Sequence, residues 1–565
     1  MLPILIPLFL LLAPSPTQEI GGGSELLFEW DGGRAVDYLG HSVSGAGDVN
    51  GDGYDDLIIG AYAATPSGVQ DAGAAYIYSG MDGSLIHLLE GSFYSGWLGY
   101  SVSGAGDVNA DGFADVIVGA INDSPGGIAN AGSAYVYSGL DASILFQFDG
   151  VAVDDAIGDA ISDAGDVNGD GFADVIVGAP WQDPGGLHSA GSAFVYSGAD
   201  GSLLYQWDGT IADEEFGYSV SGAQDVNGDG YDDLIVGAAR FNPGGRPNAG
   251  SAFVFSGVDG SLIHRLDGEA QDDSFGWSVS DTGDVDGDGF ADIFIGAHYT
   301  TAGGTPRVGS AYLHSGATGA LIYKFDGTES DDKFGWSVSG PGDVNGDAIP
   351  DLLVGARGAN PVGRPNTGAV YIYSGSDGSL IAQRYGEESN NFFGNSVSGA
   401  GDVNMDGLAD IIVGAFAADP GGRIYAGSAY AFSYSPYLQS NTRAVSASNG
   451  GVLSLTLNFP FDAAFDHYKV LISETGTGPT FYGTEIPLTL DHLVGQTFFG
   501  SYPVMTYSNM HGTLNASGNA SASLTLPSGI PSALIGKTYY LAAIANPPGR
   551  LPEFSSVAVA VEITP

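Results

Sequence analysis

Short apolar runs alternate with turns rich in glycine and aspartate from residue 25 to about residue 436. In the first unit of this pattern the runs span residues 41–46, 57–61, 73–78 and 84–89. Short apolar runs bounded by turn-forming residues are typical of β-strands, and no segment shows sustained helical periodicity. The pattern therefore predicts units of four strands each.

The unit recurs seven times at a constant interval. A string of the type Asp-Val-Asn-x-Asp-Gly begins every 59 residues, at Asp48, Asp107, Asp166, Asp225, Asp284, Asp343 and Asp402. Four-stranded units at a fixed period of this size are typical of β-propeller blades. We therefore predict an all-β fold whose main domain, residues 25–436, is a seven-bladed β-propeller of four-stranded blades.

The two ends of the repeat array predict how the ring closes. The last unit ends after residues 427–433 and lacks a fourth strand. The segment 26–32, which precedes the first unit, matches the fourth-strand endings at 204–209 and 322–327. We expect this N-terminal segment to complete blade seven, because closure removes exposed strand edges.

The segments that flank the repeats have different patterns. Residues 2–13 form an apolar run of signal-peptide length, so residues 1–20 are predicted to be a secretory signal peptide; the alternatives are an N-terminal anchor and an incorrectly assigned start. No other apolar run approaches about 18 residues, so no transmembrane segment is expected in the mature chain. Alternating segments such as 451–457 and 557–561 predict that residues 441–565 form a small antiparallel β-sandwich-like module.

Composition adds a strong negative charge to this picture. Asp and Glu total 66 against 15 Lys and Arg, which gives a formal net charge of −51. Such a charge argues against nucleic acid or an anionic membrane as a partner. Because 44% of the residues are hydrophobic, the chain is expected to be packed, and the acids are expected to bind a hard cation. The absence of cysteine excludes disulfides, thiol catalysis and Cys-ligated metal sites.

Each predicted blade carries one acidic loop between its first two strands. Counted from the first Asp of the repeated string, oxygen-bearing side chains fall at positions 1, 3, 5 and 9, and a glycine at position 6 permits a sharp turn. The carbonyl of position 7 can also point inward. Oxygen ligands of this kind suit Ca²⁺, and Mg²⁺ is the second choice because it demands stricter octahedral geometry. An EF-hand is excluded because position 12 is apolar, as at Ile59.

The predicted ligands are positions 1, 3, 5, 7 and 9 of all seven loops, which would hold up to seven Ca²⁺ ions. In chain order they are Asp48, Asn50, Asp52, Tyr54, Asp56, Asp107, Asn109, Asp111, Phe113, Asp115, Asp166, Asn168, Asp170, Phe172, Asp174, Asp225, Asn227, Asp229, Tyr231, Asp233, Asp284, Asp286, Asp288, Phe290, Asp292, Asp343, Asn345, Asp347, Ile349, Asp351, Asp402, Asn404, Asp406, Leu408 and Asp410. The alternative is a set of Asx-rich turns without metal. Carboxylates this close repel one another strongly unless a cation is present, which favours the metal sites.

The sixth loop differs from the others at position 6. Ala348 replaces the glycine there. If the backbone is left-handed at this position, the added Cβ costs about 1 kcal/mol. The sixth loop is therefore predicted to hold the weakest calcium site.

One complete repeat carries a family resemblance. Residues 216–238 read Phe-Gly-Tyr-Ser-Val-Ser-Gly-Ala-Gln-Asp-Val-Asn-Gly-Asp-Gly-Tyr-Asp-Asp-Leu-Ile-Val-Gly-Ala, which resembles an FG-GAP repeat, and all seven units share the resemblance. It implies the propeller of integrin alpha chains and of their secreted bacterial relatives, with calcium in the hairpins between strands one and two. In integrins only some blades carry calcium, whereas all seven loops match here.

The function that these features predict is binding, not catalysis. No His-Glu-x-x-His motif occurs, and the three histidines after the repeats, His467, His492 and His511, are interpreted as ordinary surface or core residues. We expect a secreted or cell-surface-associated calcium-binding propeller that acts as an adhesion or ligand-binding scaffold. The alternatives are a carbohydrate-binding, lectin-like module and part of a secreted hydrolase.

Arginine is placed unevenly in the propeller. The loops between strands two and three contain none in blades one to three and six in blades four to seven, namely Arg240, Arg246, Arg307, Arg357, Arg364 and Arg423. Because guanidinium groups bind carboxylate, sulfate and phosphate, this face is a candidate site for an extracellular protein or an anionic polysaccharide. The alternative is that acidic inter-blade loops such as 213–215 and 331–332 pair with these arginines.

Overall fold

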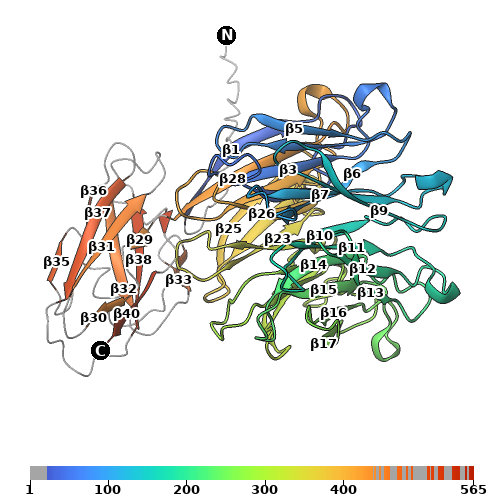
Figure 1. The fold of residues 1–565 in the computed structure, drawn as a ribbon. Coiled ribbons are helices and arrows are strands. Elements are labelled where there is room, and N and C mark those ends of the chain that lie inside the picture. Colours follow the sequence, from blue (N-terminus) through green and yellow to red (C-terminus); the bar gives the residue numbers. More distant parts are fainter. Residues whose placement is uncertain are drawn as a thin grey trace, which may run out of the picture.

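The computed structural model describes residues 22–436 and, after them, separate strands between residues 438 and 564 (Figure 1). The predicted signal peptide, residues 1–20, lies outside the described residues. Seven four-stranded antiparallel sheets make up residues 22–436, and the described residues contain no α-helix. The predicted seven-bladed β-propeller is thus confirmed. No helix in the described part of the chain is long and apolar enough to cross a membrane.

The first six blades each contain four consecutive strands, from the central channel outward. They are β2 (Val43–Gly47), β3 (Asp56–Ala61), β4 (Ala74–Tyr78) and β5 (Leu85–Glu90); β6 (Leu98–Gly106), β7 (Asp115–Ala120), β8 (Ser133–Tyr137) and β9 (Ile144–Asp149); β10 (Ala160–Gly165), β11 (Asp174–Ala179), β12 (Ser192–Tyr196) and β13 (Leu203–Asp208); β14 (Ser219–Gln224), β15 (Asp233–Ala238), β16 (Ser251–Phe255) and β17 (Leu262–Asp267); β18 (Ser278–Asp281), β19 (Ile293–Ala297), β20 (Ser310–His314) and β21 (Leu321–Asp326); and β22 (Phe334–Gly342), β23 (Asp351–Ala356), β24 (Ala369–Tyr373) and β25 (Leu380–Tyr385).

Blade seven joins the two ends of the repeat array. It consists of β26 (Ser396–Gly401), β27 (Asp410–Ala415), β28 (Ser428–Pro436) and β1 (Gly22–Asp31). Strand β1 pairs antiparallel with β28, and the two lie side by side in Figure 1. Beyond the strand, the Gly32 N–H donates to the Gly427 carbonyl at 2.9 Å. The N-terminal strand therefore covers the outer edge of β28 and closes the ring.

The core of the ring lies between neighbouring blades. The second strands, such as β3 and β7, are buried at every residue, so they read as continuous apolar runs. Ile58 and Ile77 of blade one pack in one cluster with Val116 and Val118 of blade two. This packing repeats around the ring and holds the loops at both ends of the strands in fixed positions.

The loops emerge on two opposite faces. On one face, the turn between β4 and β5 meets the acidic loop, because the Gly80 N–H donates to Asp56 Oδ1 at 3.0 Å. On the other face, Arg240 after β15 contacts Glu215 before β14 at 3.0 Å. We call these the acidic-loop face and the inter-blade face. The inter-blade face also carries short 3₁₀ turns in every blade except the fifth: η1 (Pro66–Gly68), η2 (Pro125–Gly127), η3 (Pro184–Gly186), η4 (Pro243–Gly245), η5 (Pro361–Gly363) and η6 (Pro420–Gly422).

The described strands after residue 437 form two larger sheets and one hairpin. Their orders are β29-β31-β37-β35, β30-β40-β38-β32-β36 with β39 beside β38, and β33-β34. One pair, β30 with β40, is parallel, and the others are antiparallel. The bounds are β29 (Leu438–Ser440), β30 (Ala444–Ser446), β31 (Gly451–Asn458), β32 (His467–Ser473), β33 (Pro479–Phe481), β34 (Glu485–Pro487), β35 (Thr506–Ser508), β36 (His511–Thr513), β37 (Asn519–Leu526), β38 (Thr538–Asn546), β39 (Phe554–Ser555) and β40 (Val559–Thr564).

Candidate metal centres

In all seven acidic loops the carboxylate at position 1 accepts from the N–H groups of positions 5 and 6, and the carboxylate at position 5 accepts from the N–H of position 7. In the first loop, Asp48 Oδ1 accepts from the Gly51 N–H at 2.7 Å, and Asp48 Oδ2 accepts from the Gly53 N–H at 2.9 Å. Asn50 Oδ1 accepts from the Asp52 N–H at 2.9 Å, and Asp52 Oδ1 accepts from the Tyr54 N–H at 3.0 Å. These local bonds hold the side chains at positions 1, 3 and 5 against the turning backbone, which is the arrangement a cation-binding loop needs.

Positions 4 and 6 of the loops require a left-handed backbone. In the first loop Gly51 and Gly53 have φ values of 75° and 88°. Ala348 at position 6 of the sixth loop has φ of 63°, so the left-handed backbone predicted there is confirmed. Two further non-glycine residues, Ala110 and Met405, occupy position 4 of the second and seventh loops with φ of 56° each, and the sequence reasoning missed them. Each costs about 1–2 kcal/mol of backbone strain.

Neighbouring loops also touch one another. A Cβ added to Gly51 would lie 2.7 Å from the ring of Phe113, which stands at position 7 of the next loop. The same approach joins Gly228 to Phe290, at 2.3 Å. Gly169 and Tyr231, and Gly346 and Leu408, approach in the same way, whereas a Cβ added to Gly287 of the fifth loop would meet nothing within 4 Å. The side chain at position 7 therefore covers position 4 of the preceding loop at four junctions of the ring.

The aspartate at position 9 begins or immediately precedes the second strand of each blade, and it is buried in all seven. In the fifth loop Asp292 Oδ2 accepts from the Val285 N–H at 3.0 Å and from the Asp286 N–H at 3.1 Å. Asp292 Oδ1 accepts from the Gly316 N–H, in the turn between β20 and β21, at 3.1 Å. The carboxylate thus ties three chain segments together. The loop motif predicts only a metal-ligand role for position 9 and does not predict this anchoring role.

Burial raises the pKa of every position-9 carboxyl. The nearby aspartates at positions 5 and 1, or at position 3 in the fifth loop, raise it further, whereas the backbone N–H groups lower it. The pKa rises to about 6 for Asp115 and Asp292, to about 7 for Asp56, Asp174 and Asp233, and to about 8 for Asp410, and it lies well above the usual value for Asp351. A cation beside these groups would favour their charged form.

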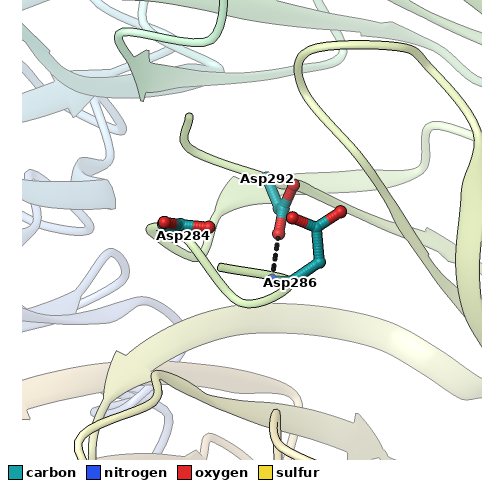
Figure 2. A group of neighbouring side chains, drawn as sticks. All are labelled: Asp284, Asp286 and Asp292. Carbon is teal, nitrogen blue, oxygen red and sulfur yellow. Dashed lines mark hydrogen bonds between the residues drawn. The ribbon is translucent and has the colours of Figure 1, made fainter. Parts of the chain in front are cut away.

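The fifth loop brings three carboxylates together. Oxygen atoms of Asp284, Asp286 and Asp292 all lie within 4.8 Å of one another (Figure 2). Burial, together with Asp288 and Asp284, raises the pKa of Asp286. A ligand set of carboxylate oxygens without nitrogen or sulfur suits a hard cation such as Ca²⁺ or Mg²⁺. The residues of this loop therefore fit the cation that the sequence predicts.

The other six loops have asparagine where the fifth has Asp286. In the sixth loop the Asn345 side-chain amide donates to Asp351 Oδ1 at 2.9 Å, and in the fourth loop Asn227 donates to Asp233 Oδ1 at 3.2 Å. The amide thus supplies a hydrogen-bond donor to the buried carboxylate. In the fifth loop Asp286 places a fourth carboxylate there instead.

Each of the six predicted ligand-face arginines has a partner within the propeller. Arg240 contacts Glu215 at 3.0 Å, and Arg307 contacts Asp331 at 3.4 Å. The remaining four donate to other groups. Arg246 Nη2 donates to the Gly268 carbonyl at 3.0 Å, and Arg364 Nη1 donates to the Glu387 carbonyl at 2.6 Å. Arg423 Nε donates to the Gly32 carbonyl at 3.0 Å, and its Nη2 lies 3.6 Å from Asp31 Oδ2. Arg357 Nη1 donates to Asn395 Oδ1 at 2.9 Å, and the Arg357 guanidinium lies 3.2 Å from the centre of the Trp336 ring. Arg240 and Arg307 thus pair with the acidic inter-blade loops, as the alternative interpretation expects, whereas the other four donate to backbone or amide oxygens. The ligand face stays a prediction.

Comparison with known proteins agrees with this architecture. The FG-GAP repeat model matches residues 39–78, 98–137, 160–196, 216–255, 275–314 and 334–373, which are the first three strands of blades one to six. Blade seven has the same strand order and its own acidic loop, 402–410, beyond the matched ranges.

Several similar proteins are integrin alpha chains. Integrin alpha-V of Gallus gallus is 33% identical over 215 residues, which cover 36% of this chain and 20% of the relative. Integrin alpha-5 of Xenopus laevis is 32% identical over 243 residues, covering 40% and 21%, and integrin alpha-PS2 of Drosophila melanogaster is 31% identical over 300 residues, covering 49% and 20%. The matched part spans about a fifth of the length of these relatives. The chain is thus an FG-GAP repeat protein, and its seven-bladed propeller resembles that of integrin alpha chains.

Proposed function

We propose that this chain is a secreted or cell-surface calcium-binding propeller that acts as an adhesion or ligand-binding scaffold and not as an enzyme. One observation carries the proposal. Seven loops of a single design present oxygen-bearing side chains at the same four positions, and in the fifth loop three carboxylates lie within 4.8 Å of one another. The resemblance to integrin alpha propellers and the apolar run at residues 2–13 support the adhesion role and the secretion.

The metal is proposed to be held by the side chains at positions 1, 3, 5 and 9 with the carbonyl of position 7. When bound, Ca²⁺ supplies positive charge to a loop that otherwise gathers like charges. The chain contributes the geometry: the glycines permit the turn, the hydrogen bonds at positions 1, 3 and 5 orient the oxygens, and the buried position-9 carboxylate anchors the loop to the blade. Because the ions belong to the scaffold, a ligand is expected on the opposite, inter-blade face.

The experiment compares the purified chain in calcium with the same chain in excess chelator. We expect calcium to bind with a stoichiometry of up to seven in isothermal titration and to raise the melting temperature. A variant that replaces Asp284, Asp286 and Asp288 with alanine should bind one ion fewer. An unchanged stoichiometry in this variant would contradict the assignment of the loop residues.

A further inference from the structure

Two hollows on the inter-blade face are lined by equivalent positions of the repeat. The hollow between blades two and three is lined by residues that include Asn130, Asp154 and Trp181. The hollow between blades four and five is lined by Asn248, Asp272 and Tyr299, each of which lies two repeats after its counterpart. The same local surface is therefore built twice.

Each hollow combines an exposed aromatic ring with a paired amide and carboxylate. Trp181 is 38% exposed and Tyr299 is 36% exposed. The Asn130 side-chain amide donates to Asp154 Oδ1 at 2.8 Å, and Asn248 donates to Asp272 Oδ1 at 2.9 Å. Both asparagines have φ of 49° and both aspartates have φ of 63°, so the backbone that presents the pair is also the same in the two hollows.

The aromatic position sets these two hollows apart from the other inter-blade junctions. In the remaining five blades the equivalent residue is not aromatic; it is Ala63, Asn122, Arg240, Gly358 and Ala417 in blades one, two, four, six and seven. An aromatic ring left more than a third exposed beside planar polar groups is a common design for recognising a small polar molecule that also has an apolar face.

We propose that each hollow binds one pyranose unit of a polysaccharide. The apolar C–H face of the sugar ring would pack on Trp181 or Tyr299, and the neighbouring Asn–Asp pair would exchange hydrogen bonds with its hydroxyls. This inference rests on the proposed ligand-binding function and names the ligand class. A polysaccharide is favoured over a protein because the two hollows are separate and charged side chains line both, whereas the centre of a protein interface is one contiguous patch with few charged residues.

The two hollows differ in charge. The second hollow contains Arg240 and Arg307 where the first has Asn122 and Ser189. The two guanidinium side chains are 54% and 63% exposed although each contacts one carboxylate. An exposed guanidinium can still reach a carboxylate or sulfate on a sugar. The second hollow is therefore inferred to take an acidic sugar, and the first a neutral one.

The test is a glycan array that carries neutral galactans and mannans, polygalacturonate oligosaccharides and sulfated oligosaccharides, probed with the calcium-loaded full chain. Trp181→Ala should weaken binding to the neutral sugars at least tenfold, and Tyr299→Ala should do the same for the acidic sugars. Arg240→Ala with Arg307→Ala should remove the acidic preference. Trp181→Phe keeps a ring and should retain binding, which separates stacking from a folding defect.

Tyr94→Ala is the matched control, because Tyr94 is a 71%-exposed aromatic residue that lines neither hollow. It should bind as the unchanged chain does. Absence of binding to every glycan would overturn the inference. Glycan binding by the Trp181→Ala and Tyr299→Ala variants that equals binding by the unchanged chain would also overturn it. Binding only to a panel of deglycosylated extracellular proteins would also overturn it, but would leave the proposed scaffold function standing. A calcium-independent melting temperature would instead count against the scaffold function itself.

Discussion

Replacing Asp292 with alanine should separate the structural role of position 9 from its role as a metal ligand. The Asp292 carboxylate is 0% exposed and accepts hydrogen bonds from the backbone N–H groups of Val285, Asp286 and Gly316. Alanine removes both carboxylate oxygens and with them all three hydrogen bonds. Asp288, in the same loop, is exposed and accepts from the Phe290 N–H. Asp288→Ala therefore removes a predicted ligand without removing a hydrogen bond from the buried part of the blade.

The expected magnitude follows from these contacts. A buried N–H group left without an acceptor costs about 1–3 kcal/mol, so three of them cost roughly 3–6 kcal/mol after partial rescue by water. For a propeller of about 410 residues the entropy of unfolding near 60 °C is about 0.9 kcal/mol/K, so this loss lowers the melting temperature by about 4–7 °C. Asp288→Ala should cost less than about 1 kcal/mol in calcium-free protein, because its one partner is at the surface.

Differential scanning calorimetry in excess chelator is the appropriate assay, followed by the same scans in saturating calcium. Asp292→Ala should melt several degrees below the unchanged chain in both conditions. Asp288→Ala should melt normally in chelator and show a deficit only in calcium. Equal melting temperatures of the two variants in chelator would refute the reasoning that position 9 anchors the blade.

Three further changes test the loops. In chelator, the free energy of unfolding should fall as pH rises from about 4 to 8. The position-9 carboxyls have folded pKa values of about 6 to 8 against the usual 3.8, so over this range the folded state binds more protons than the unfolded state. A melting temperature that rises over this range would contradict the raised pKa values. Ala348→Gly should raise the free energy of unfolding by up to about 1 kcal/mol. It should also increase the occupancy of the sixth site at limiting calcium, measured by anomalous diffraction. If the sixth site of the unchanged chain fills with or before the others, backbone strain at Ala348 does not weaken it. Asp286→Asn gives the fifth loop the ligand set of the other loops, so it should raise the melting temperature in chelator and weaken calcium binding at the fifth loop. Stronger calcium binding by this variant in titration calorimetry would argue against a metal site formed by Asp284, Asp286 and Asp292.

The fold could be predicted from the sequence because the signal repeats. The 59-residue interval and the short apolar runs specify the same four strands seven times, so local ambiguity averages out. In blade one the observed strand starts differ from the predicted ones by no more than two residues, as at Val43 and Leu85. The left-handed backbone at Ala348 was equally predictable, since six sister loops carry glycine there.

Other features needed the structure because they depend on chain segments that meet only after folding. Gly80 lies 24 residues after Asp56, and nothing in the loop motif indicates that its N–H bonds the buried carboxylate. The partners of the arginines are set by how each inter-blade loop crosses to the next blade, which puts Arg246 on a backbone carbonyl and Arg357 on a tryptophan ring. Ala110 and Met405 were a different kind of omission, because aligning position 4 of the seven loops would have shown them.

The most direct test of the account is calcium binding coupled to stability. Chelated and dialysed protein should be titrated with Ca²⁺ and melted at each point. At a free calcium concentration 100 times its Kd, one site stabilises the folded chain by about 2.7 kcal/mol, so several sites together should raise the melting temperature by many degrees. The account predicts up to seven ions per chain and a melting temperature that climbs with calcium. No bound calcium, or the same melting temperature in excess chelator and in saturating calcium, would contradict it.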